Sequence, residues 1–191
     1  MPEPPPRSLL FIALAAEEQG LLGSEYYVAH PTVPTARIVA DLNFDGANIW
    51  GRTTDVVAVG FGKTTLDQVI ARAAATQDRV LVDDPFPERG HFYRSDQFNF
   101  AKAGVPALLL ESGVNYIGRP EGWGREQVDA WTEQHYHQPS DELTPDWDFT
   151  GMIEDARLAF LVGLDLAQSS EMPAWVPGDE FEAARKRSGS P

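Results

Sequence analysis

Short apolar runs alternate with helix-like segments along this chain, and that alternation restricts its fold more than any other feature. The runs at 9–16, 55–62 and 105–112 are rich in Val, Leu, Ile and Ala and show little polar alternation. Such strands are typical of a sheet that is covered on both faces. The pattern therefore predicts an α/β fold with three layers, α/β/α, around a mostly parallel sheet.

The order of the expected elements follows from the same pattern. Strands are expected at 9–16, 36–45, 55–62, 79–84 and 105–112, and helices at 19–29, 64–76, 95–103 and 148–169. Ser95 is expected to cap the third helix, and residues 113–145 are expected to form a long loop. We expect three parts: a Pro-rich segment at 1–8, one domain at 9–170 and a polar, frayed tail at 171–191.

Charge and cysteine content exclude several classes of function. The formal net charge is −14, so the chain repels the phosphates of nucleic acids and anionic membranes. No apolar run is long enough to insert into a membrane. The chain has no cysteine, which excludes disulfides, thiolate metal sites and a Cys nucleophile.

Acidic residues follow several of the expected strands. They are Glu17, Glu18, Asp45, Asp83, Asp84 and Glu111. Ligands of α/β sheets bind beyond the carboxyl ends of parallel strands. Carboxylates crowded at such an edge are costly unless a cation neutralises them, although each one alone could cap a helix or face solvent. His137 stands four positions before Asp141, a carboxylate that could orient the imidazole of a metal ligand.

Four segments carry a resemblance to a known family. They are "AAEEQGLLGSEYY", "LNFDG", "YRSDQFNFAKAGVPALLLESG" and "YHQPSDE", in that order. Together they resemble the zinc aminopeptidases of metallopeptidase family twenty-eight, which share a fold with the glutaminyl cyclases. The similarity extends from Leu9 over nearly the whole chain. It implies a peptidase catalytic domain with a mixed, mostly parallel sheet.

The resemblance implies a role for each matching residue. Glu17 matches the general base, which would take a proton from a metal-bound water and pass it to the leaving amine. Glu18 and His137 match ligands of a first zinc ion, and Asp45 matches a ligand of a second. A His often follows the Asp of the third segment in the family, where this chain has Gln97. Weaker supporting or substrate-pocket roles are expected for Asp96, Asp141 and Tyr116.

The resemblance also implies zinc ligands that have no match here. Family members have a further His and a bridging Asp before the double-Glu segment, and nothing before Leu9 matches them. A catalytic zinc normally has three protein ligands, so the set here is incomplete. We therefore expect a C-terminal part of a peptidase domain whose N-terminal strands are missing, which would be sticky and nearly inactive alone. No pattern supports His91 or Asp84 as a substitute ligand.

Three functions remain open at this point. The first is an aminopeptidase that hydrolyses the N-terminal bond of a peptide substrate. The second is a glutaminyl-cyclase-like acyl transferase that uses one zinc ion. The third is a non-catalytic binding module of the same fold. Family members are commonly exported, which implies a periplasmic or secreted location for a longer parent. The location of this chain and its oligomeric state stay open.

Overall fold

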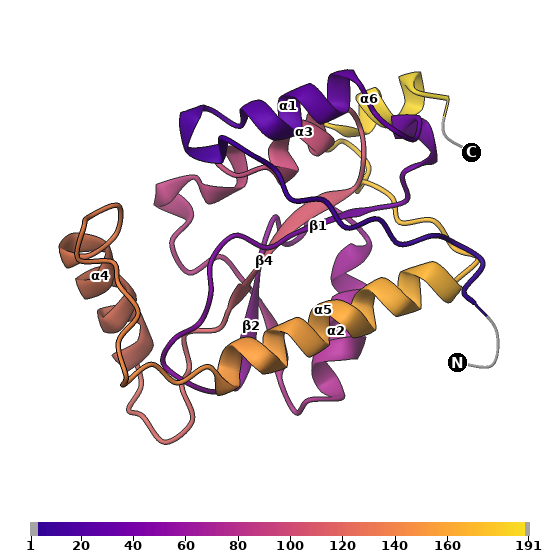
Figure 1. The fold of residues 1–191 in the computed structure, drawn as a ribbon. Coiled ribbons are helices and arrows are strands. Elements are labelled where there is room, and N and C mark those ends of the chain that lie inside the picture. Colours follow the sequence, from indigo (N-terminus) through magenta and orange to yellow (C-terminus); the bar gives the residue numbers. More distant parts are fainter. Residues whose placement is uncertain (1–3, 190–191) are drawn as a thin grey trace.

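A four-stranded sheet lies between two layers of helices in the computed structural model, which describes residues 4–189 (Figure 1). The strands are β1 (Asp41–Asn43), β2 (Asp55–Val59), β3 (Val80–Asp83) and β4 (Ala107–Ser112). They lie in the order β1-β4-β2-β3. The pairs β1–β4 and β2–β3 are parallel, and the pair β2–β4 is antiparallel. The predicted α/β fold with a mostly parallel, mixed sheet is confirmed.

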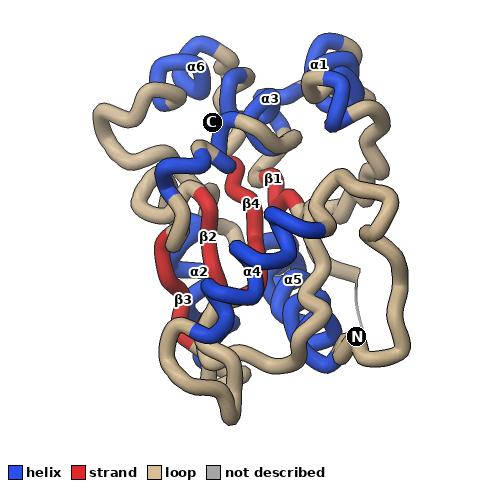
Figure 2. Tube along the Cα trace, turned by 90° about the vertical axis from the view of Figure 1, so that its left-hand side faces the viewer, coloured by secondary structure: helices blue, strands red, loops and turns tan. Residues whose placement is uncertain are grey.

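Helices cover both faces of this sheet (Figures 1 and 2). One layer contains α1 (Leu22–Ala29), α3 (Gln97–Lys102) and α6 (Glu182–Arg187). The other layer contains α2 (Leu66–Ala75) and α5 (Thr150–Gln168). A further helix, α4 (Trp123–Gln134), stands beside these layers, at the left of Figure 1. Four short 3₁₀ turns complete the described elements: η1 (Glu17–Gln19), η2 (Thr35–Arg37), η3 (Pro87–Arg89) and η4 (His91–Tyr93).

The two central strands are apolar because both of their faces are buried. Successive side chains of a strand point to opposite faces of the sheet. Val56 and Leu108 accordingly pack in the core formed with α2 and α5. Val57 and Leu109 pack in the other core, which includes side chains of α3 and Phe181. This burial on both faces explains why residues 56–59 and 107–110 are all apolar.

The first apolar run is not the buried strand that its composition predicts. Leu9 is 46% exposed and Phe11 is 90% exposed, and no strand is assigned between 9 and 16. Within residues 4–189, no backbone hydrogen bond joins this run to a strand, and an unpaired segment cannot enter a sheet. Instead, Arg7 donates its backbone N–H to the carbonyl of Ala167 near the end of α5, 3.2 Å away.

Three other expectations about elements need correction. The strand expected at 36–45 is reduced to β1, which pairs only with β4 in the described sheet. The expected loop at 113–145 contains the twelve-residue helix α4, which buries only Gly124 fully and therefore lacks a strong apolar stripe. Ser95 does not cap α3, because its hydroxyl binds Asp45 instead.

The segment after α5 packs against the domain instead of fraying. Trp175 and Phe181 are 4% and 6% exposed and belong to the core on the α1–α3 side of the sheet. The indole Nε1 of Trp175 donates to the carbonyl of Gly104, 2.9 Å away. The described part of the polar tail is therefore an integral part of the fold. Its last two residues, 190–191, lie outside the described part.

No described helix combines the length and the apolar character that crossing a membrane requires.

Candidate active site

A tight turn presents the two adjacent glutamates before α1. The turn is η1, and it is flanked by Ala16 and Leu21, which both adopt left-handed backbone conformations with φ of 59° and 61°. L residues with side chains rarely adopt this conformation, so the backbone is strained on both sides of the pair. The carbonyl of Glu17 accepts hydrogen bonds from the backbone N–H groups of Gly20 and Leu21. Glu17 is half-buried, whereas Glu18 is exposed.

His137 reaches this turn from the segment that follows α4. Its Nε2 lies 2.8 Å from Oε1 of Glu18. His137 has a left-handed backbone, with φ of 58°, and its ring stacks on that of Tyr136 at 3.8 Å between centroids. The fold thus brings together the two residues that were expected to bind one metal ion.

Asp45 follows β1 and belongs to the same group of charges. Its Oδ2 accepts a hydrogen bond from the hydroxyl of Ser95 at 3.0 Å. The pKa of Glu17 is raised, first by burial and then by the charges of Asp45, Glu18 and Asp96, while His137 lowers it. All four side chains therefore lie within electrostatic range of the Glu17 carboxyl. The predicted base and the three predicted metal ligands converge in one region.

Two further carboxyl groups lie below this surface. Asp96 is 7% exposed, and its pKa is raised mainly by burial and also by the charge of Asp45, while a hydrogen bond with Ser24 lowers it. Burial and the charge of Asp96 raise the pKa of Asp41 to about 7. One oxygen of each carboxyl group, Asp96 Oδ1 and Asp41 Oδ2, is buried without a hydrogen-bond partner. The sequence signal for Asp41 is an acid that directly follows the apolar residues 38–40 within the expected strand.

The donors of the site match the chemistry of zinc, but their number does not complete a site. An imidazole nitrogen and carboxylate oxygens are ligands that zinc uses in proteins. Among the residues described, however, no three His, Cys, Asp or Glu side chains form a group that could hold a metal ion. Glu18 and His137 are in contact, while Asp45 is held by Ser95. The described residues therefore offer two adjacent ligands where a catalytic zinc normally has three.

Several candidate residues of the sequence lie apart from this group. Asp141 is exposed, and within the described chain no hydrogen bond or ion pair joins it to His137. Tyr116 is buried and donates its hydroxyl proton to Oδ1 of Asn48, in edge-to-face contact with neighbouring tryptophan rings. His91 pairs with Glu111, 3.7 Å away. None of these contacts places Asp141, Tyr116 or His91 beside Glu18.

Sequence reasoning missed the polar residues that support Asp45. Ser95 was expected only as a helix cap, and Gln97 only as a departure from the family pattern. Asn43 and Ser95 are 52 positions apart, yet the Nδ2 of Asn43 lies 2.8 Å from the Ser95 hydroxyl. The signal that could have found Asn43 is its spacing, because it stands two positions before Asp45 at the end of a strand.

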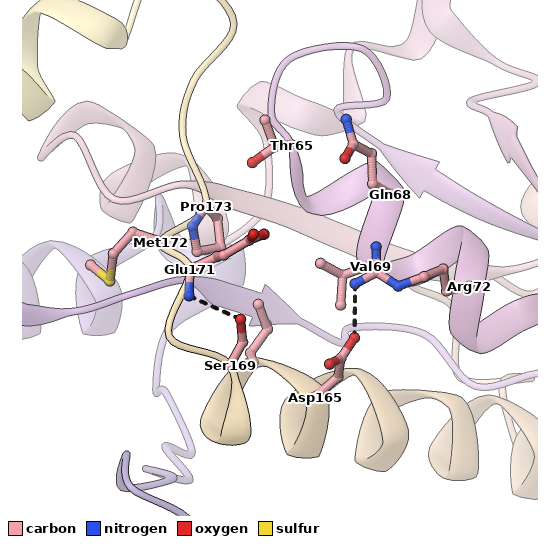
Figure 3. A pocket seen from close by; sticks show the side chains of 10 residues that line it. Thr65, Gln68, Val69, Arg72, Asp165, Ser169, Glu171, Met172 and Pro173 are labelled. Carbon is pink, nitrogen blue, oxygen red and sulfur yellow. Dashed lines mark hydrogen bonds and ion pairs between the residues drawn. The ribbon is translucent and has the colours of Figure 1, made fainter.

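A small cavity of about 60 Å³ lies elsewhere, between α2 and the end of α5 (Figure 3). Two of its polar side chains already have partners: Arg72 binds Asp165 at 3.0 Å, and the hydroxyl of Ser169 accepts the backbone N–H of Glu171. The cavity contains none of the residues discussed above. It carries no arrangement suited to catalysis.

The chain is similar to known peptidases in sequence. The family model described as "Peptidase family M28" matches residues 1–161. Leupeptin-inactivating enzyme 1 of Streptomyces exfoliatus is 32% identical over 144 residues, which is 73% of this chain and 31% of that enzyme. The chain thus spans about a third of the length of this relative.

Solved structures of aminopeptidases share the fold. The LapA aminopeptidase of Legionella pneumophila superposes with a TM-score of 0.56 at 16% identity, over 83% of this chain and 38% of that one. The aminopeptidase of Aneurinibacillus sp. strain AM-1 superposes with a TM-score of 0.50 at 19% identity, over 83% and 33%. Since the family model covers most of the sequence and these structures share the architecture, the chain belongs to peptidase family M28.

Proposed function

We propose that this chain carries part of the active site of a zinc-dependent aminopeptidase, in which Glu17 is the general base. The observation that supports this most directly is the grouping of charges around Glu17. The Glu17 carboxyl lies within electrostatic range of Glu18, Asp45, Asp96 and His137, and the pair Glu18–His137 is in contact at 2.8 Å. Glu17 is the residue for which the family resemblance implies a catalytic role, and Glu18, Asp45 and His137 are those for which it implies metal binding.

Glu17 would move the proton in the reaction. Its carboxylate would accept a proton from the attacking water and deliver it to the nitrogen of the leaving amine. Half-burial and neighbouring negative charges both favour the protonated form of this group, which suits a base that must hold a proton between the two transfers. The left-handed residues Ala16 and Leu21 flank the turn that presents Glu17 and Glu18.

Glu18 and His137 would hold a zinc ion, and Asp45 would contribute from the neighbouring strand. Zinc supplies Lewis acidity, which polarises the scissile carbonyl and activates water. Asp45 and the other carboxylates also create a negative potential that attracts the ammonium group of a peptide N-terminus. Further ligands would have to come from outside the group described above.

The contact between Glu18 and His137 also favours a second candidate, an acyl transferase of the glutaminyl-cyclase kind with one zinc ion. Among residues 4–189, Glu18 and His137 are the only pair of expected ligands in contact, and Asp45 is engaged by Ser95. The two functions differ in their products. An aminopeptidase releases a free amino acid, whereas the acyl transferase forms pyroglutamate from an N-terminal glutamine.

Hydrolysis of leucine p-nitroanilide by zinc-loaded protein tests the proposal. We expect Glu17→Gln to lower kcat by at least about 100-fold, because general base catalysis contributes on that scale. Glu25→Gln is the matched control, since Glu25 is exposed on α1 a short distance along the same segment. Equal rates for Glu17→Gln and the wild type would refute the role of Glu17. Pyroglutamate formation without amino acid release would favour the acyl transferase.

A further inference from the structure

A chain of four hydrogen bonds leads from the backbone to Asp45. The Nε2 of Gln97 lies 3.0 Å from the carbonyl oxygen of Phe92. The Oε1 of Gln97 lies 2.9 Å from the Nδ2 of Asn43, which is also 2.8 Å from the hydroxyl of Ser95. The Ser95 hydroxyl lies 3.0 Å from Oδ2 of Asp45. These four hydrogen bonds join the loop before α3, the start of α3 and the end of β1.

Every bond in this chain has only one possible direction. A backbone carbonyl can only accept, so the amide NH₂ of Gln97 must face Phe92 and its carbonyl oxygen must face Asn43. The NH₂ of Asn43 must then donate both to Gln97 and to Ser95. A carboxylate can only accept, so the Ser95 hydroxyl, whose oxygen accepts the bond from Asn43, donates its own proton to Asp45.

We propose that Asn43 and Gln97 are positioning residues, which hold Asp45 in one orientation through Ser95. Gln97 is fully buried, while Asp45 is exposed and would otherwise exchange between side-chain rotamers. The chain of hydrogen bonds engages Oδ2 of Asp45 and leaves Oδ1 for a cation. The cation part of this inference rests on the proposed function, in which Asp45 contributes to a zinc site.

Histidine is the replacement for Gln97 that keeps a donor and an acceptor along this path. A neutral imidazole has one N–H donor and one acceptor nitrogen, as the glutamine amide does along this path. Either side chain can therefore link the Phe92 carbonyl to Asn43. A leucine side chain is of similar size but can neither donate nor accept a hydrogen bond.

The rotamer of Asp45 in metal-free protein is the first test. Three-bond scalar couplings from the backbone to Cγ of Asp45 should report one rotamer in the wild type and in Gln97→His. The couplings should average in Asn43→Leu and Gln97→Leu. Gln77→Leu is the matched control. It removes a hydrogen bond of the same kind, from Nε2 of Gln77 to the carbonyl of Glu154 at 3.0 Å, but leaves the four hydrogen bonds that lead to Asp45 intact. Averaging in the wild type, or one rotamer in Gln97→Leu, would overturn the inference.

A second measurement needs no variant and applies even if the substitutions prevent folding. The side-chain amide protons of Asn43 and Gln97 should exchange with solvent far more slowly than those of Gln138, which is exposed. Equal exchange rates would also overturn the inference.

Zinc titration separates this inference from the proposed function. Loss of a residue that orients a ligand typically weakens metal binding 10- to 100-fold, so we expect at least about a tenfold loss in Gln97→Leu and recovery in Gln97→His. If the wild type binds no zinc while the couplings of Asp45 behave as expected, the proposed metal site fails but the positioning chain stands. If the wild type binds zinc and Gln97→Leu binds it equally well, the chain has no role in metal binding.

Discussion

The Nε2 of His137 lies 2.8 Å from Oε1 of Glu18, although 119 positions separate the two residues. Glu18 is presented by the turn before α1, and His137 by the segment that leaves α4. Their contact therefore depends on two parts of the chain that share no secondary structure. It also leaves both side chains exposed to solvent, where a ligand can reach them.

Replacing His137 by alanine should weaken zinc binding much more than it weakens the fold. An exposed ion pair contributes at most about 1 kcal/mol to the free energy of unfolding, so a small change is expected there. Zinc affinity should fall by at least about tenfold, because a ligand is lost. Urea denaturation and zinc titration measure the two quantities. Asp141→Ala is the control. If Asp141→Ala lost as much zinc affinity as His137→Ala, the assignment of His137 as a zinc ligand would be contradicted.

The carboxyl of Asp41, whose Oδ2 is buried, should make the protein less stable as the pH rises from about 4 to about 7. Its pKa is about 7 in the folded state and 3.8 when unperturbed, so the folded state binds more protons across this range. Stability from this group is full below pH 4 and is lost on the way to pH 7, by a few kcal/mol, about 1.4 for each pKa unit.

Asp41→Asn should remove this loss, so the variant should be more stable than the wild type at pH 7.5 and close to it at pH 4. Urea denaturation at a series of pH values measures the difference. Asp141→Asn, which changes an exposed carboxyl, should follow the wild-type curve. Parallel curves for Asp41→Asn and the wild type would refute the raised pKa.

Truncating Trp175 should destabilise the whole domain. Trp175 is buried in the core beside Phe181 and binds the carbonyl of Gly104. Large aromatic residues replaced by alanine in a core typically cost about 3–5 kcal/mol. Thermal and urea denaturation should show a loss of this size for Trp175→Ala and almost none for Leu143→Ala, whose side chain is largely exposed. A loss below about 0.5 kcal/mol would mean that the tail is not part of the core.

Phe86 should keep α4 in place. Its ring is buried and contacts the guanidinium groups of Arg89 and Arg125, whose carbons lie 4.1 and 4.5 Å from the ring centroid. Arg89 also binds Asp129 on α4. Phe86→Ala should therefore raise amide exchange in residues 123–134 by about tenfold or more, while β2 and β4 stay protected. Phe61→Ala, at an exposed ring, is the control; unchanged exchange in α4 would contradict this role.

The exposed apolar residues at 9–12 should promote self-association. Phe11 is 90% exposed and neighbours three other apolar side chains that are at least 39% exposed. Contiguous apolar surface of this kind favours association. Phe11→Ser should shift sedimentation toward the monomer at high concentration and change the free energy of unfolding by less than about 0.5 kcal/mol. A large loss of stability would show that Phe11 is buried in solution.

The sequence predicts the central strands well because the burial of each strand determines its own amino-acid composition. Every residue of β2 is buried, so its composition identifies it without knowledge of its neighbours. The run at 9–16 has the same composition but no strand partner among the described residues, and pairing is a property of the whole fold. Helix α4 was missed for the opposite reason, because it contributes little to the core.

The candidate site also contains residues that the sequence predicts and residues that it does not. Glu17, Glu18, Asp45 and His137 belong to short contiguous motifs, so resemblance alone was enough to propose them. The supporting residues Asn43 and Ser95 come from distant segments, and their partnership exists only after β1 and the loop before α3 have come together. The pairing of the half-buried Asp41 with the buried Asp96 is likewise a product of tertiary packing.

The zinc content of purified protein, measured after loading and dialysis together with the hydrolysis of leucine p-nitroanilide, tests the central claim most directly. The account predicts that the wild type retains zinc, that Glu18→Gln and His137→Ala lose it, and that Glu17→Gln retains zinc but loses turnover. Retention of zinc by Glu18→Gln and His137→Ala at the wild-type level, or full turnover in Glu17→Gln, would contradict it.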